Sequence, residues 1–194
     1  MLFLLRWYLQ SRFPKYRRAY RLVFDPEGFH HYPKELKTQV EGQSREEILR
    51  SLESTLATYR NKSGTPRLQE TYETLAAVII QLPVILEIVV EMINKSSLSF
   101  SEKKNLIAIV AYLVCPIDII PEGAMGGVGF ADDAICASIA INSVLSDGNH
   151  EEAKKLWNSH APILEKIRLL NQLSEENLPN LYSEVRDAYM KVFA

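Results

Sequence analysis

The sequence contains few cysteines and none of the common catalytic signatures. Its two cysteines, Cys115 and Cys136, have no CxxC or zinc-finger spacing, which excludes the disulfide framework of small secreted domains. Both are expected near the turn of a helical hairpin, so a disulfide between them is geometrically possible. Free buried thiols in a reducing compartment are favoured. The sequence also lacks a GxSxG elbow, a Walker loop and a dinucleotide fingerprint, so no common enzyme class is indicated.

Uninterrupted membrane-length hydrophobic runs and export signals are absent as well. Arg6 interrupts the apolar residues 1–5 and no small-residue cleavage site follows, which argues against secretion. The apolar stretches 75–93 and 106–115 are either interrupted by polar residues and proline or too short to span a bilayer, and we expect core helices there. The four histidines, which lack zinc-ligand spacing and are expected at the surface, are His30, His31, His150 and His160. These features predict a cytoplasmic protein.

The composition that remains is that of an ordinary globular chain. Hydrophobic residues make up 47% and charged residues 24% of the 194 residues, which is enough for one sizeable core and short of two typical domains. We therefore expect residues 1–194 to form a single domain. The net charge of -2 excludes a strongly basic nucleic-acid binder, and no nucleic-acid partner is expected.

The charge is unevenly distributed along the chain. Residues 1–24 contain no acidic residue, and their six basic residues are Arg6, Arg12, Lys15, Arg17, Arg18 and Arg21. With 22 basic and 24 acidic residues in total, the remainder holds 16 and 24, a balance of -8. Apolar residues recur every three to four positions through the same segment, which predicts a basic amphipathic helix. Its charges could meet an anionic membrane surface, a protein partner or the acidic body of its own chain, and packing of its apolar stripe onto the core is the favoured use of that stripe.

Helical patterns fill the rest of the sequence, and no period-two strand pattern is present. Ser44-Arg45-Glu46-Glu47 is a capping-box pattern that starts a helix. The next helix, which Thr65-Pro66 is expected to open and which carries Leu68, becomes apolar on nearly every side before Pro83, which is typical of a central helix. A small-residue helix is predicted from about Asp132 to Leu145, and Pro179 is expected to open the last one. We predict an all-α fold, a compact multi-helix bundle around a central apolar hairpin.

That hairpin, placed at residues 106–145, carries the most specific motif of the chain. Its turn is Cys115-Pro116-Ile117-Asp118-Ile119-Ile120-Pro121-Glu122, and its second helix opens with Gly129-Phe130-Ala131-Asp132-Asp133. This pair of motifs resembles the YkvA-like family, a bacterial domain of unknown function. Cys115 and Glu122 stand where that pattern has serine and aspartate, and the link 123–128 is richer in glycine. The resemblance implies a helical fold element and no established activity.

Two interpretations of the hairpin's polar residues are open. In the first they are structural. Pro116 and Pro121 fix the turn, Asp118 accepts backbone N–H groups in it, and Asp132 and Asp133 stand at the start of the second helix, where carboxylates are favoured. In the second, the carboxylates converge at one end of the hairpin and bind Mg²⁺, Mn²⁺ or Ca²⁺. The metal-site hypothesis comprises Asp118, Glu122, Asp132 and Asp133.

Three functions follow from these features. The leading prediction is a non-enzymatic helical binding or scaffold protein that acts at the inner face of the membrane or on a protein partner, since the chain has a basic N-terminus and no catalytic motif. The first alternative is a divalent-metal-dependent enzyme that uses the acidic end of the hairpin. The second is an immunity-type protein that neutralises a toxin by covering a basic active site.

Overall fold

Helices account for all the regular structure that the computed structural model describes. The described residues are 36–38, 40–59, 67–94, 103, 106, 107, 109, 110, 112, 119, 120, 129–146 and 151–191. The named elements are α4 (Arg45–Thr55), the 3-10 turn η2 (Leu56–Thr58), α5 (Leu68–Asn94), α8 (Ala131–Ser146), α9 (Glu151–Asn158), α10 (Ala161–Asn177) and α11 (Pro179–Lys191). The predicted all-α bundle is confirmed, and the basic segment 1–24 lies outside the described residues.

Local capping signals fix several of the helix starts. The Ser44 hydroxyl accepts a hydrogen bond from the Glu47 backbone N–H at 3.2 Å, and the Ser44 N–H donates to the Glu47 carboxylate at 2.7 Å. These two bonds complete the predicted capping box of α4. Pro179 is the first residue of α11, as predicted, because its missing N–H costs nothing in the first helical turn.

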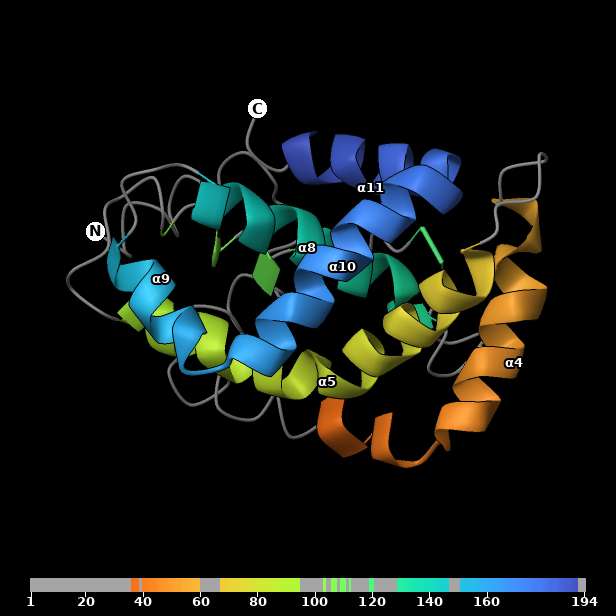
Figure 1. Cartoon of the computed structure of the whole chain (residues 1–194), viewed down its shortest axis with the longest axis horizontal. Coiled ribbons are helices and arrows are strands. Elements are labelled where there is room, and N and C mark those ends of the chain that lie inside the picture. The colour runs from red at the N-terminus through yellow and green to blue at the C-terminus, as the bar shows by residue number, and fades with distance from the viewer. Residues whose placement is uncertain are drawn as a thin grey trace, which may run out of the picture.

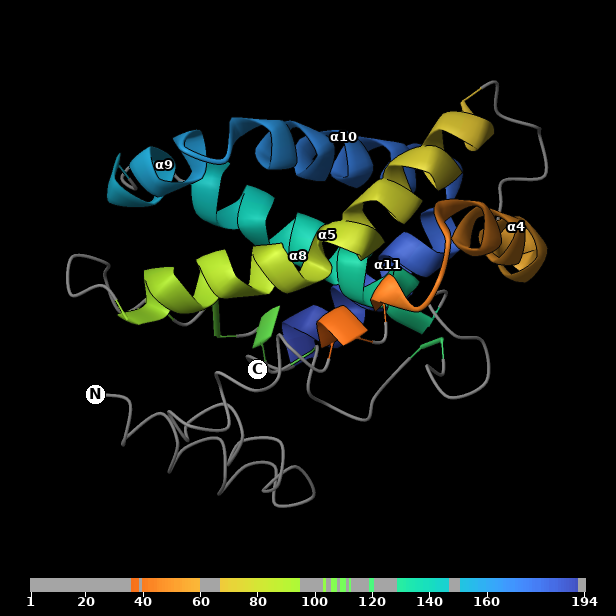
Figure 2. The same cartoon turned by 90° about the horizontal axis from the view of Figure 1, so that it is seen from below.

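Helix α5 continues through Pro83 to Asn94. Proline cannot donate the N–H that an interior helical residue normally supplies, and the helix changes direction along its length (Figure 2), as expected at such a residue. Among the described helices, Leu68–Ile93 is long and apolar enough to cross a membrane, with a hydropathy of 2.2 in its most apolar window. However, 67% of that window is buried inside the protein, so α5 serves as a core helix here.

Helix α8 lies at the centre of the bundle. It contacts α5, α9, α10 and α11, and Figures 1 and 2 show it between α5 and α11, with α10 packed against both α5 and α8. Almost all its residues are buried, because short side chains such as Ala134, Ala137 and Ala140 let the neighbouring helices approach closely on several sides. The predicted helix from Asp132 to Leu145 is thus confirmed, and it begins one residue earlier than expected.

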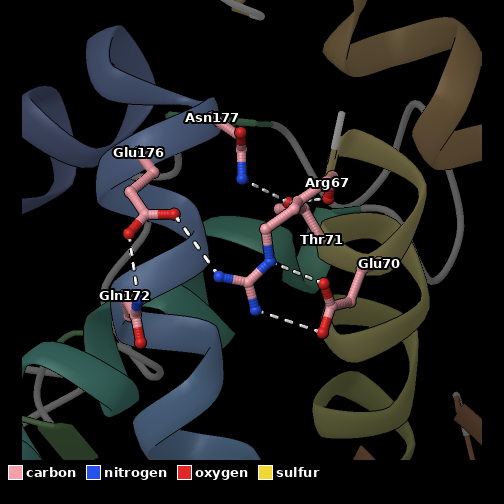
Figure 3. Close-up of polar contacts among 6 residues, drawn as sticks. All are labelled: Arg67, Glu70, Thr71, Gln172, Glu176 and Asn177. Carbon is pink, nitrogen blue, oxygen red and sulfur yellow. Dashed lines mark hydrogen bonds and ion pairs between the residues drawn. The ribbon is translucent and has the colours of Figure 1, made fainter. Parts of the chain in front are cut away.

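A polar cluster joins the beginning of α5 to the end of α10 (Figure 3). The buried Asn177 amide donates to the Thr71 hydroxyl at 2.9 Å, and that hydroxyl donates to the Arg67 carbonyl at 2.9 Å. At the surface, the Arg67 guanidinium pairs with Glu70 at 2.8 Å and with Glu176 at 3.8 Å. The buried amide–hydroxyl bond fixes the register of the two helices, whereas the half-exposed ion pairs add little free energy.

Candidate functional site

The candidate site is the start of α8 together with the described residues of the hairpin turn. Asp132 and Asp133 occupy the first turn of α8, where the helix dipole favours carboxylates. Both residues are only 1% exposed, which is uncommon for aspartate unless the carboxylate is paired or hydrogen-bonded.

The Asp132 carboxylate connects three segments of the chain. Its Oδ2 atom accepts a hydrogen bond from the Ile119 backbone N–H at 2.9 Å and from the Tyr112 hydroxyl at 3.3 Å. Tyr112 belongs to the first helix of the hairpin and Ile119 to the turn, so one oxygen atom ties both to α8. The turn and the start of the second helix therefore meet, as expected for an antiparallel hairpin. The acceptor of the Ile119 N–H is Asp132, whereas Asp118, the expected turn acceptor, lies outside the described residues.

The electrostatics of this cluster keep its other titratable groups neutral. Burial raises the pKa of the Tyr112 phenol, and the negative charge of Asp132 raises it further. Burial also raises the pKa of the Cys136 thiol well above its usual value, with Asp133 and Asp132 adding to the effect. Tyr112 therefore remains a hydrogen-bond donor, and the protonated Cys136 is a poor nucleophile.

Cys136 is free and buried, as predicted. Helix α11 packs against α8, and its buried Tyr189 has a phenol pKa that is raised mainly by burial and secondarily by Cys136. Asp132, Asp133 and Cys136 are thus buried in a helix that α11 covers on one side. Such an environment suits a structural hydrogen-bond network better than chemistry that requires solvent access.

The metal-site hypothesis is only partly addressed by this geometry. Asp132 and Asp133, which are adjacent in the sequence, are both buried at the start of α8. Asp118 and Glu122 lie outside the described residues, as do the turn prolines Pro116 and Pro121. Among the residues that are described, no three or more histidine, cysteine, aspartate or glutamate side chains are grouped to hold a metal ion. The four-carboxylate cation site thus stays a prediction.

Sequence reasoning missed the roles of Tyr112 and Ile119. A usable signal was present for Tyr112, because its hydroxyl is the one polar side-chain group in the apolar stretch 106–114, and a buried phenol normally needs a partner. No comparable signal marks Ile119, since its contribution is a backbone N–H.

Comparison with known proteins gives one short match. Residues 103–139 match the model of a family described as a protein of unknown function (DUF1232). The match contains Tyr112, Ile119 and Asp132, so the hydrogen-bonded cluster lies within the family segment. No curated protein and no solved structure matches the chain.

Proposed function

We propose that this protein is a non-enzymatic helical binding or scaffold protein that acts peripherally at the inner face of a bacterial membrane. In this proposal the YkvA-like hairpin supplies the framework and residues 1–24 supply the contact with anionic lipid. The observation that carries the proposal is the separation of charge along the chain: +6 on residues 1–24 and -8 on the remainder. A cationic, aromatic-rich amphipathic segment is the usual means of peripheral binding to anionic lipid.

The packing of α5 supports peripheral contact rather than membrane insertion. Its most apolar window is mostly buried against other helices, and removing it from the bundle would expose the core that α4, α8 and α10 form with it. Burial of that apolar surface already stabilises the folded protein. Contact with lipid is therefore assigned to a segment outside this bundle.

The chemistry of the hairpin supports a structural use of its buried acids. Asp132 directs its Oδ2 atom at two donors of the same hairpin, and Cys136 is held as a neutral thiol. Groups used in this way hold the two helices and the turn together. We therefore assign the DUF1232-like segment to the framework of the protein.

Vesicle sedimentation tests the membrane contact. The full-length protein should sediment with vesicles that contain phosphatidylserine or phosphatidylglycerol at low salt, and binding should fall as salt screens the charges. Replacement of Arg12, Arg17 and Arg18 by glutamine removes three positive charges from the segment. This variant should lose about 3 kcal/mol of binding free energy, on the order of a hundredfold in affinity.

A matched variant separates a local effect from a change in net charge. Arg45, Arg50 and Arg168 are exposed on α4 and α10, and replacing them by glutamine changes the net charge by the same three units. That variant should bind vesicles like the wild type. Equal losses for both variants, or equal binding of the wild type to neutral vesicles, would refute the proposed role of residues 1–24.

A further inference from the structure

Helix α5 carries an exposed stripe whose chemistry complements that of residues 1–24. The stripe follows helical spacing, and its exposed members are Glu73, Ile80, Val84, Glu87 and Glu91, with the half-buried Ala77 between the first two. Ile80 is 38% and Val84 41% exposed, and they are two of the three large hydrophobic side chains exposed in the described part of the chain. Aliphatic side chains thus occupy the middle of the stripe, with carboxylates at both ends.

The charge of α5 selects the kind of partner that fits this stripe. The helix contains four glutamates and no lysine or arginine. Pairing with the same stripe of a second copy would bring rows of like charge together, which is unfavourable. A segment with an apolar stripe and basic flanks would instead cover Ile80 and Val84 and would place its basic side chains near the glutamates.

We propose that residues 1–24 dock on this α5 stripe of their own chain and leave it when they bind anionic lipid. The segment has six basic residues and an apolar residue every three to four positions, which is the complementary pattern. This inference rests on the proposed membrane role of the same segment and adds its regulation. The acidic stripe and the lipid surface compete for the same basic side chains of residues 1–24.

The chain is long enough for this contact. The described residues begin at Leu36, and Leu36 and Val40 are part of the core. Figures 1 and 2 both show this short helical piece, in orange, beside the middle of α5. The 11 residues 25–35 can span up to about 37 Å, while α5, with 27 residues, is about 40 Å long. Either half of the stripe is therefore within reach.

Hydrogen exchange on the full-length protein tests the docking. In the wild type, amides of residues 1–24 should exchange more slowly than in a synthetic peptide of the same sequence. Ile80→Gln with Val84→Gln should raise their exchange rates by about tenfold, because docking covers the exposed parts of these two side chains. Glu73→Gln with Glu87→Gln should also raise the rates, and by less at high salt.

Met190→Gln is the matched control. Met190 is 59% exposed on α11, and its replacement should leave the exchange of residues 1–24 unchanged. Exchange as fast as that of the free peptide, or protection that survives the Ile80/Val84 change, would overturn the docking. Protection that rises with protein concentration would assign the stripe to a second copy and would also overturn it.

Vesicle binding of the same variants distinguishes the two proposals. If docking competes with lipid, the neutral Ile80/Val84 variant should bind anionic vesicles more tightly than the wild type. Protection of residues 1–24 without vesicle binding by any variant would support docking and refute the membrane role. Vesicle binding that is identical in wild type and variant, together with no protection, would retain the membrane role and refute the docking.

Discussion

Removal of the Asp132 carboxylate should destabilise the protein more than an ordinary helix-start substitution does. The variant is Asp132→Ala, which leaves the Ile119 N–H and the Tyr112 hydroxyl without their shared acceptor. A buried donor left unsatisfied costs about 1–3 kcal/mol. Ile119 is partly buried and its bond is 2.9 Å long, so we assign it about 1–2 kcal/mol.

The Tyr112 bond contributes less, because 3.3 Å exceeds the usual O–H···O distance of about 2.7–2.8 Å. With about 1 kcal/mol for this donor, the expected total is about 2–3 kcal/mol. That is a large share of the roughly 5–15 kcal/mol that stabilises a typical domain. Asp132→Asn should cost less, since its amide oxygen still accepts one of the two bonds.

Urea unfolding followed by far-ultraviolet circular dichroism measures this loss, with Glu70→Ala as the control. Glu70 is also an acid in the first turn of its helix, but its side chain is 45% exposed in an ion pair with Arg67, so its removal should cost about 0–1 kcal/mol. In a Tyr112→Phe background, Asp132→Ala should cost less, because one donor has been removed. Equal losses for Asp132→Ala and Glu70→Ala, or no coupling with Tyr112→Phe, would refute the assigned role.

Two further results are expected from the same cluster. Burial and Asp132 raise the pKa of Tyr112 in the folded state above its ordinary value of 10.0, so the unfolded chain releases this proton first as the pH rises. The contribution of this raised pKa to the free energy of unfolding is therefore full below pH 10.0 and falls as the pH rises above it. Tyr112→Phe should reduce the loss of unfolding free energy that urea unfolding measures at alkaline pH. If the buried acids are structural, millimolar Mg²⁺, Mn²⁺ or Ca²⁺ should leave the melting temperature unchanged in wild type and Asp132→Asn; a rise confined to the wild type would favour the cation site instead.

Local sequence signals were sufficient where a helix start depends on a few adjacent residues. The Ser44–Glu47 box and Pro179 identified the starts of α4 and α11, because capping is decided within one turn of the chain. Pro83 shows the limit of such signals. Tertiary burial of Leu82, Ile85 and Leu86 outweighs the one hydrogen bond that proline removes, so α5 continues where local propensity alone would disfavour it.

The sequence by itself determined the helical class, the central position of α8 and the separation of charge, because these depend on residue type and spacing. Only the tertiary structure showed which donors bond to the Asp132 carboxylate. The sequence offered Asp132 as a helix-start residue or a metal ligand, and in the structure its Oδ2 atom accepts hydrogen bonds from Tyr112, 20 residues away, and from a backbone N–H in the turn. Such long-range partners carry no local periodicity, because they are brought together only when the hairpin closes and its core excludes water.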